Sequence, residues 1–516
     1  MPDTVKLTID GKEIEVPKGT TVLQAAGMMG LDVPRYCYHP GLTIAGNCRI
    51  CLVDIEKTPK LSTSCTTIAA DGMVVHTAGA KVEEGRRGVM EFLLANHPLD
   101  CPICDQAGEC RLQDYAYEHG QGGSRFVEEK LKGFKQKSIG PHVVLDTERC
   151  IVCTRCVRFT DEITHTGELG VFQRGAHAYI DIVPGHQLDN LYSGNTVDIC
   201  PVGALTLKEF RFKKRVWELH DVPSVCGACA RGCNVNVGTA DNEVHRLTPR
   251  ENQAVNRWWM CDVGRLSHLQ LEQPRLLEAA SRTAAAGESR TLPWPEALDL
   301  LAQRLRAARP GAVAVVASAS LTLEDLYMLS RLSKEVLKEA DVVLPAHVEG
   351  EDDALLIRAD KTANAAGAGR LGLALDDGAR LRKVLKAGAE GRLDLLLVLS
   401  EPVAGLDALQ GKTFVAVHTP FAEHARHADL ALPAAAWGEF EGTWVNFQHR
   451  AQRVRRALTP PGVALEGWRL ISELMLRMGV PAAHASAGDV LGEMSARVES
   501  LRALAGKPPG PLGVAL

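Results

Sequence analysis

The chain has 516 residues, a formal net charge of −5 at pH 7 and 46% hydrophobic residues. This length predicts about three to five domains with cores of their own. The slightly acidic balance gives no electrostatic case for a nucleic-acid partner. The longest apolar runs, at 312–317 and 393–399, are too short to span a membrane and predict buried strands.

Residues 1–80 are expected to form a first module. Alternating apolar residues on both sides of Asp10-Gly11 predict a β-hairpin. Thr20 or Thr21 can cap a short helix that follows. A cysteine loop comes next, with the spacing C-x10-C-x2-C-x13-C for Cys37, Cys48, Cys51 and Cys65. The order of elements resembles the β-grasp fold of plant-type [2Fe–2S] ferredoxins, although those have C-x4-C-x2-C. The longer spacing points to the ferredoxin module of large NADH-linked redox complexes.

Two further cysteine segments follow, at 81–120 and 140–215. In the first, His97 precedes three cysteines, Cys101, Cys104 and Cys110. Because this trio lacks a fourth thiolate, we predict that His97 is a ligand and not a packing residue. The second segment has C-x2-C-x2-C followed by a distant Cys-Pro, the ferredoxin spacing that places three thiolates around a cubane, with Cys150, Cys153, Cys156 and Cys200. The basic run at 211–215 is expected to be a solvated face near a domain junction.

Residues 219–275 contain the last cysteine set, and 276–516 contain no cysteine. The set has the spacing C-x2-C-x3-C and a later fourth member, in Cys226, Cys229, Cys233 and Cys261. After it, amphipathic helices such as 295–309 alternate with strand-like runs, which predicts an α/β domain. The G-x-G-x-x-G match at 367–372 follows a polar stretch and not a strand, so we do not expect a dinucleotide site there. The tail at 506–511 is expected to fray.

The cysteines need a common explanation, because all fifteen fall into these four sets. The N-terminus has neither a basic nor an apolar segment of a signal peptide, so we expect a reducing compartment without disulfides. Structural zinc is the alternative, since it also takes four cysteines or three and a histidine. The ferredoxin spacing favours iron–sulfur clusters in place of zinc.

With these four sets in this order, the chain resembles the large iron–sulfur subunit family of bacterial NADH:quinone oxidoreductase, respiratory complex I. The resemblance implies a [2Fe–2S] site in the first set and a [4Fe–4S] site in each of the other three, the second with histidine ligation. It further implies that electrons enter at the first set, pass the Cys150 set and leave from the His97 set. The last cluster would lie off this path.

The resemblance also implies the setting of the protein. A partner subunit would oxidise NADH on a flavin, and other iron–sulfur and quinone-site subunits would receive the electrons. The complex would sit on the cytoplasmic face of the inner membrane as part of a peripheral arm, without a direct membrane span. This chain would be an electron conduit in a translocating enzyme and would have no catalytic residues of its own.

The region after about 220 resembles the molybdopterin oxidoreductase fold, including the segments 428–433 and 439–446. It is shortened and has no thiolate after Cys261 to hold molybdenum, so we expect a non-catalytic domain without molybdopterin. Two other complexes share the N-terminal cluster array and stay open as alternatives: an NAD-dependent formate dehydrogenase and a hydrogenase. A pure scaffold would have little use for fifteen placed cysteines.

Overall fold

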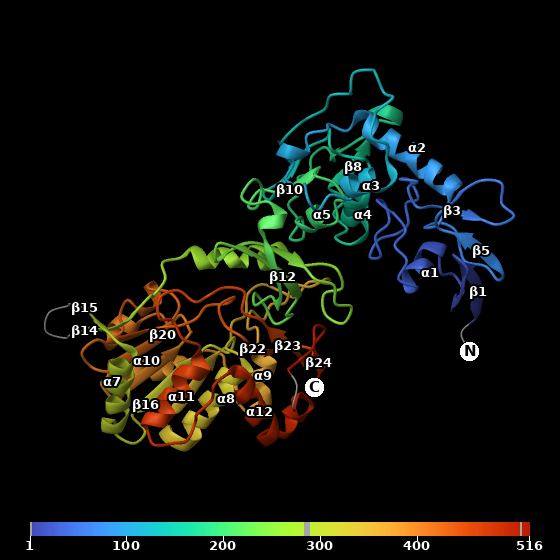
Figure 1. The fold of residues 1–516 in the computed structure, drawn as a ribbon. Coiled ribbons are helices and arrows are strands. Elements are labelled where there is room, and N and C mark those ends of the chain that lie inside the picture. The colour runs from blue at the N-terminus through green and yellow to red at the C-terminus, as the bar shows by residue number, and fades with distance from the viewer. Residues whose placement is uncertain (1–2, 283–288, 506–507) are drawn as a thin grey trace. The chain divides into compact units, whose positions relative to one another are not determined.

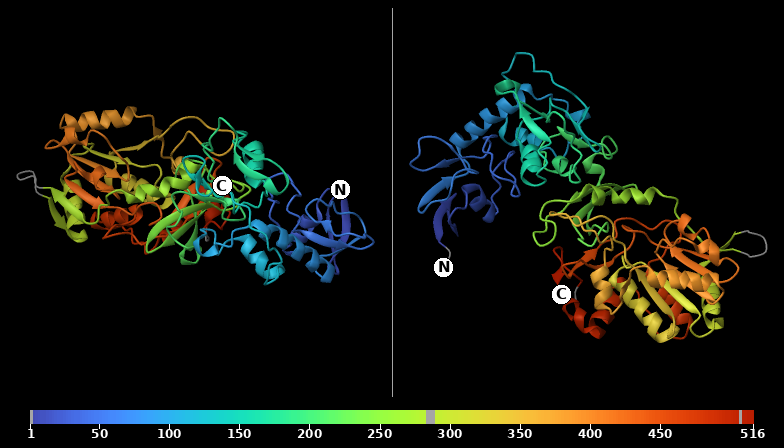
Figure 2. Two further views of the ribbon diagram at one scale, coloured as in Figure 1. Left: turned by 90° about the horizontal axis from the view of Figure 1, so that it is seen from above. Right: turned by 180° about the vertical axis from the view of Figure 1, so that it is seen from behind.

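The computed structural model describes residues 3–282, 289–505 and 508–516. The chain divides into two compact units, Met1–Leu219 and His220–Leu516, which are described separately (Figures 1 and 2). No helix of the described residues is long and apolar enough to cross a bilayer.

The first unit begins with a five-stranded sheet in the order β2-β1-β5-β3-β4. Its strands are β1 (Thr4–Ile9), β2 (Lys12–Pro17), β3 (Leu52–Ile55), β4 (Ser62–Thr63) and β5 (Met73–His76). Asp10 and Gly11 both have positive φ, 47° and 78°, the geometry that a two-residue hairpin turn requires. Thr21 caps helix α1 (Val22–Met28) in a capping box with Gln24. The predicted hairpin and helix cap are confirmed.

The rest of the first unit consists of short elements joined by long loops. Its helices are α2 (Ala80–Asn96), α3 (Arg111–His119), α4 (Arg155–Glu162) and α5 (Asn195–Asp198). Its remaining strands are β6 (Lys137–Ser138), β7 (Val143–Leu145), β8 (Leu169–Phe172), β9 (Tyr179–Ile182) and β10 (Leu205–Leu207). Most of the cysteines lie outside these helices and strands, although Cys156 lies in α4, so the elements act mainly as supports for the cysteine loops.

The second unit begins with an antiparallel meander of β11 (His220–Val225), β12 (Asn234–Ala240) and β13 (Glu243–Pro249), and α6 (Asp262–Leu266) follows. An eight-stranded sheet comes next, in the order β15-β14-β21-β20-β19-β16-β17-β18. Its strands are β14 (Ala279–Arg282), β15 (Ser289–Leu292), β16 (Val313–Ala317), β17 (Asp341–Pro345), β18 (Leu375–Asp376), β19 (Leu395–Leu399), β20 (Phe414–Thr419) and β21 (Leu430–Pro433). The six strands from β21 to β18 are parallel, so the predicted α/β class is confirmed.

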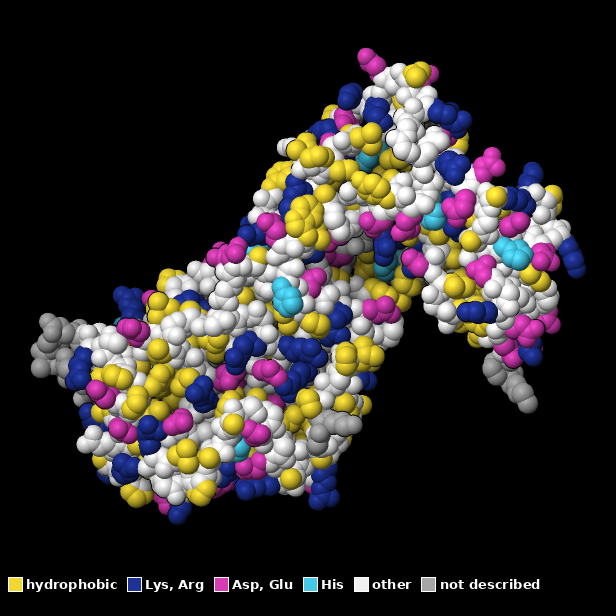
Figure 3. Space-filling view, viewed as in Figure 1, with side chains coloured by type: hydrophobic (Ala, Val, Ile, Leu, Met, Phe, Trp, Pro, Cys, Tyr) yellow, Lys and Arg dark blue, Asp and Glu magenta, His cyan; other side chains and the backbone are white. Residues whose placement is uncertain are grey.

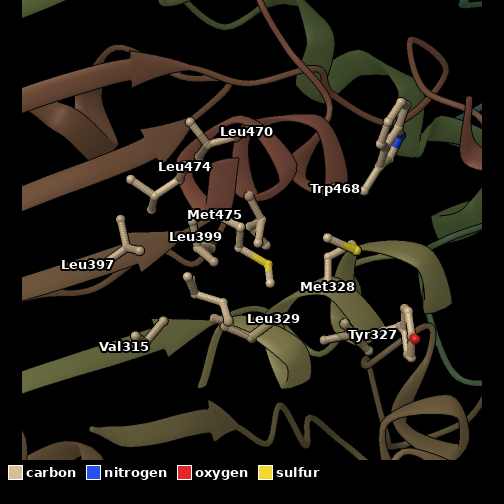
Figure 4. Packing of buried hydrophobic residues seen from close by; sticks show 14 of the residues in the cluster. Val315, Tyr327, Met328, Leu329, Leu397, Leu399, Trp468, Leu470, Leu474 and Met475 are labelled. Carbon is tan, nitrogen blue, oxygen red and sulfur yellow. The ribbon is translucent and has the colours of Figure 1, made fainter. Parts of the chain in front are cut away.

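Helices cover both faces of this sheet, and the strand residues alternate between two cores. On β19, Leu395, Leu397 and Leu399 face one core, while Leu396 and Val398 face the other. The larger core lies under helices α7 (Trp294–Ala307), α8 (Leu323–Leu332), α11 (Gly467–Arg477) and α12 (Ala487–Arg497). Figure 4 shows Leu329, Leu474 and Met475 of these helices meeting the side chains of β16 and β19. The strands of a parallel sheet that is buried on both faces have nearly continuous apolar sequences, as this chain does at 393–399.

The other elements of the second unit are α9 (Ala365–Arg370), α10 (Ala379–Ala389) and a sheet of β22 (Gly442–Val445), β23 (Arg450–Val454) and β24 (Val514–Ala515). The glycine match falls in α9 and the turn after it, and no strand precedes it. A Cβ at Gly367 would lie 2.9 Å from the Leu323 side chain, so this glycine serves packing. Of the tail, 506–507 lie outside the described residues. At 510–511 the expected fraying is wrong, because Arg250 Nη1 donates to the Pro511 carbonyl (2.8 Å) and Gly513 N donates to the Gly510 carbonyl (2.9 Å).

Candidate iron–sulfur sites

The fifteen cysteines all lie within the described residues, and all are free. The first set comes together in the loop between α1 and β3 and just after β4. Cys51 Sγ and Cys65 Sγ are 3.4 Å apart. Hydrogen bonds from the Cys48 and Cys65 thiols hold the pKa of Cys37 well below its ordinary value. These contacts link the four cysteines into one group, and their sulfur atoms are of the soft kind that the predicted cluster would need.

The second set follows α2, whose C-terminal cap is His97. The Nδ1 atom of His97 is buried and has no hydrogen-bond partner among the described residues. Burial lowers the pKa of His97 to about 4, so its imidazole is neutral, as a metal ligand must be. Burial also raises the pKa of Cys110 to about 11, with the thiols of Cys104 and Cys101 adding to the effect. An unsatisfied buried nitrogen costs free energy unless a ligand or metal pairs with it, which fits the predicted role of His97.

The third set surrounds one small cavity, which all four of its cysteines line. Val152 and Thr154, between the cysteines, have φ of 50° and 62°, and a β-branched residue rarely adopts this conformation. Such strain persists at functional sites where the surroundings enforce it. The turn also points backbone N–H groups at sulfur, including that of Val152 toward Cys150 Sγ at 3.4 Å. The backbone is thus arranged to stabilise thiolates.

The first three sets share one hydrophobic core. It contains Cys37 of the first set, Cys110 of the second and Cys153 of the third, together with Tyr36 and Met90. A close approach links the second and third sets as well. A Cβ at Gly203, which follows Cys200 by three residues, would lie only 2.3 Å from Cys104 Sγ. Glycine is required here because the backbone of one cysteine loop presses against a sulfur of the next.

The fourth set lies in the second unit, between β11 and β12 and at the start of α6. The Cys261 sulfur accepts a hydrogen bond from Gly264 N (3.3 Å), and a Cβ on Gly264 would be 3.0 Å from Cys226 Sγ. Burial raises the pKa of Cys261 to about 11. Metal binding at such a site must displace the thiol protons, so it is coupled to pH. Among the described residues, no group of three or more His, Cys, Asp or Glu is placed to hold a single metal ion.

A cavity of about 290 Å³ lies beside the fourth set, where β16 and β19 end in Ser318 and Ser400. This is the point where the strand order reverses, the usual ligand position in such sheets. No Lys or Arg is among the described residues that line it, although Asp325, Glu441 and Glu466 are. The N-terminus of α8 is already capped by Thr322 and Asp325. Phosphates are held by cations and free helix N-termini, so the lining fits a phosphate-bearing molybdopterin poorly.

Several residues around the sites were not foreseen from the sequence. Arg149 is buried and binds Asp100 through Nη2 (2.7 Å), joining the residues that precede Cys101 and Cys150. Arg215 donates to the Cys104 carbonyl (2.7 Å), so the basic run at 211–215 is not only a solvated face. Its position next to Cys150, a predicted ligand, was the available signal for Arg149. Nothing in the local sequence marks Arg215, because its partner lies 111 residues away.

Five family models match the chain, in the same order as the sites. They are the 2Fe-2S iron-sulfur cluster binding domain at 2–80, the NADH-ubiquinone oxidoreductase-G iron-sulfur binding region at 86–125, the NADH-quinone oxidoreductase subunit 3, ferredoxin-like domain at 140–206, the Molybdopterin oxidoreductase Fe4S4 domain at 219–272 and Molybdopterin oxidoreductase at 361–477. These matches and the doubly wound sheet confirm the fold class expected from the sequence, a [2Fe–2S] ferredoxin module, [4Fe–4S] segments and a molybdopterin-oxidoreductase-like α/β domain.

The chain is also similar to named proteins. The G subunit of the NADH-quinone oxidoreductase of Rickettsia bellii is 43% identical over 332 residues, 64% of this chain and 48% of that protein. The mitochondrial NADH dehydrogenase [ubiquinone] iron-sulfur protein 1 of Solanum tuberosum is 42% identical, over 64% of this chain and 44% of that protein. A chain in a crystal structure of NAD+-reducing [NiFe]-hydrogenase is 31% identical, with a TM-score of 0.38, over 41% of this chain and 91% of that chain.

These matches define an iron–sulfur protein of several modules, in which ferredoxin-type segments precede a molybdopterin-oxidoreductase fold. Over the matched residues, the chain is similar to the large iron–sulfur subunit of NADH-quinone oxidoreductase, the G subunit. It spans about half the length of the curated relatives that it matches.

Proposed function

We propose that the chain is an electron-transfer subunit of a proton-translocating NADH:quinone oxidoreductase. One observation carries this proposal: cysteines of three separate sets pack into a single hydrophobic core. Iron–sulfur clusters supply one-electron redox chemistry when bound. The contribution of the chain is to hold the ligands close together, to exclude water and to fix the charges around the sulfur atoms.

The proposed ligand sets are those expected from the sequence, one [2Fe–2S] and three [4Fe–4S]. Two observations support the order in which the first three would work. Arg158 contacts the carbonyls of both Cys37 and Cys153, and Gly203 presses the Cys200 loop against Cys104. The Cys150 set would therefore stand between the first set and the His97 set. The Cys226 set belongs to the second compact unit and would lie off this path.

Partner subunits would supply NADH oxidation on a flavin at one end and further iron–sulfur and quinone sites at the other. Leu99 and Ile103, which flank Cys101, are 67% and 66% exposed. Hydrophobic side chains are also visible on the surface of the first unit (Figure 3). Exposed apolar groups beside a redox site suit a docking surface for such a partner. We place the assembled protein in a peripheral arm at the cytoplasmic face of the inner membrane.

The second unit would serve assembly and not catalysis. Its cavity has no cationic lining among the described residues, and the sequence has no thiolate beyond Cys261. Protein purified with its partners should therefore contain no molybdenum, tungsten or pterin, and should oxidise neither formate nor hydrogen. Tightly bound pterin with metal would favour the formate dehydrogenase alternative, and hydrogen oxidation would favour the hydrogenase.

The deciding experiment is anaerobic iron and sulfide analysis with EPR spectroscopy of the complex. We expect two irons from the first set and four from each of the other three. Cys153→Ser should abolish NADH:quinone turnover, whereas Cys226→Ser should remove one cluster signal and leave most turnover intact. Stoichiometric zinc with little iron would overturn the cluster assignment. Abolished turnover in an assembled Cys226→Ser complex would overturn the off-path role of the fourth set.

A further inference from the structure

Two arginines of α4 reach from the third cysteine set to the first. Arg158 Nη2 donates to the carbonyl of Cys37 (2.5 Å) and lies 3.4 Å from the carbonyl of Cys153. A single guanidinium nitrogen thus contacts a ligand residue of each set. These residues are far apart in sequence, so the contact is a feature of the fold and not of a local turn.

Arg155 makes a parallel pair of contacts one turn earlier in the helix. Its Nη2 donates to the carbonyl of Tyr38 (2.5 Å), next to Cys37, and its Nη1 to the carbonyl of Ile199 (2.9 Å), next to Cys200. Both arginines therefore connect the backbone of the first set to that of the third. A planar guanidinium with several donors in a fixed fork suits this task, and a lysine ammonium does not reproduce it.

The hydrogen bonds that join the two sets end on neutral acceptors, which are backbone carbonyls, and Arg158 adds a bond to the Thr154 hydroxyl. These bonds therefore leave the positive charge of each arginine in place. Burial lowers the pKa of the Arg155 guanidinium, whereas the neighbouring sulfur groups of Cys153, Cys200 and Cys37 raise it and so interact with its charge. A cation between two ligand sets stabilises the more negative, reduced form of each centre, because charge interactions are strong in a partly dry interior.

Other contacts flank the arginines, so the junction does not depend on them alone. Asn47 Nδ2 donates to the carbonyl of Val152 (3.1 Å), and Thr43 N donates to Glu162 Oε2 (2.8 Å). Loss of a single arginine should therefore leave the first module docked on α4. This redundancy makes substitution at Arg155 or Arg158 a test of their charge and geometry.

We propose that Arg155 and Arg158 are positioning residues that fix the first cysteine set against the Cys150 set and place positive charge between the two redox centres. The proposal rests on the proposed electron-transfer function. It assigns two separable roles, since the charge sets the midpoint potentials and the fork sets the magnetic and electronic coupling between the centres.

The test uses the full chain in its complex, with Arg155→Gln, Arg158→Gln, Arg155→Lys and Arg158→Lys. Arg174→Gln, an exposed arginine of the same unit, is the matched control. Anaerobic redox titration by EPR gives the midpoint potential of each centre. The enhancement of spin relaxation between the reduced centres reports their coupling. Iron and sulfide content is measured first for every variant.

With full cluster content, the Gln variants should lower the midpoint potentials of the first and Cys150 centres and leave that of the Cys226 centre unchanged. The Lys variants should retain the potentials but weaken the coupling. Unchanged potentials in both Gln variants would overturn the charge role, and unchanged coupling in both Lys variants would overturn the positioning role. If a Gln variant does not assemble, the Lys variant at the same position decides the positioning role and the other Gln variant the charge role. A parent complex without iron–sulfur signals would contradict the proposed function itself.

Discussion

The two units of the chain are stabilised in different ways. The second has a doubly wound sheet whose apolar side chains fill cores on both faces. The first has strands of two to six residues. Beside the apolar core of its five-stranded sheet, it has two further cores in which cysteines lie together with Tyr36, Met90 and Ile139. A sheet with this much buried apolar surface can be stable alone. A core that contains predicted cluster ligands should depend on the group that those residues would bind.

The largest expected effect tests this difference in stabilisation between the two units. Iron and sulfide are removed from the protein by anaerobic chelation. The cysteine loops of the first unit should lose protection against hydrogen exchange, because bare thiols in its core cannot replace the bonds to a metal centre. Strands β16, β19 and β20 of the second unit should retain theirs. Hydrogen-exchange mass spectrometry of the loaded and stripped protein measures both. Equal protection of the cysteine loops in the two forms would show that the first unit folds without its clusters.

The second unit contains a buried carboxyl group whose protonation should affect the stability of that unit alone. Glu324 of α8 is fully buried, and its carboxylate accepts hydrogen bonds from Thr443 N (2.8 Å) and Oγ1 (2.9 Å). Burial raises its pKa from 4.5 to about 7. The folded state therefore holds this proton more tightly than the unfolded state. The stability that the proton contributes is complete below pH 4.5 and is lost as the pH rises toward 7.

Glu324→Gln keeps a neutral group of the same shape and should remove this pH dependence. We expect the variant to be more stable than the parent by about 3 kcal/mol above pH 7 and nearly equal to it at pH 4.5. Proteolysis of the second unit in urea, at both pH values, measures the difference, with exposed Glu349→Gln as the control. Parallel stability curves for parent and variant would mean that Glu324 is charged at neutral pH. The clusters of the first unit should not respond.

The elements that the sequence predicted correctly are those that local sequence patterns determine. Periodicity and turn residues predicted the first hairpin, the helix capped by Thr21 and the buried strands at 312–317 and 393–399, because local patterns determine these elements. The cysteine spacings predicted which residues group together, and the structure assembles the first and third sets in this way. The ligand assignments themselves stay predictions, as do the domain boundaries at 80, 120, 140, 215 and 275.

What the sequence could not predict are the contacts between sets. Arg158 and Cys37 are 121 residues apart, and Gly203 reaches Cys104 across about half of the first unit. Gly203 follows the Cys-Pro of the third set, but nothing in that motif indicates a contact with Cys104, and a glycine or arginine has many ordinary reasons to be present. The tail shows the same limit, since composition predicted fraying at 506–511, where a hydrogen bond from Arg250, 261 residues away, holds the Pro511 carbonyl. Long-range docking depends on the complete surface of both partners, which no local pattern contains.

The smallest expected effect follows substitution of His97. It should change the midpoint potential of the second set's cluster more than the stability of the fold. A neutral imidazole leaves a cluster one unit less negative than a fourth thiolate would, so histidine ligation should raise the midpoint potential. His97→Cys should therefore lower the potential of the second set's cluster while the cluster still assembles. Redox titration by EPR measures the shift. His119→Cys is the matched control, because His119 lies on α3 and binds Glu83 (3.2 Å). An unshifted midpoint with an unchanged spectrum in both His97→Cys and His97→Ala would remove His97 from the ligands and leave its buried nitrogen as a cost that the fold tolerates.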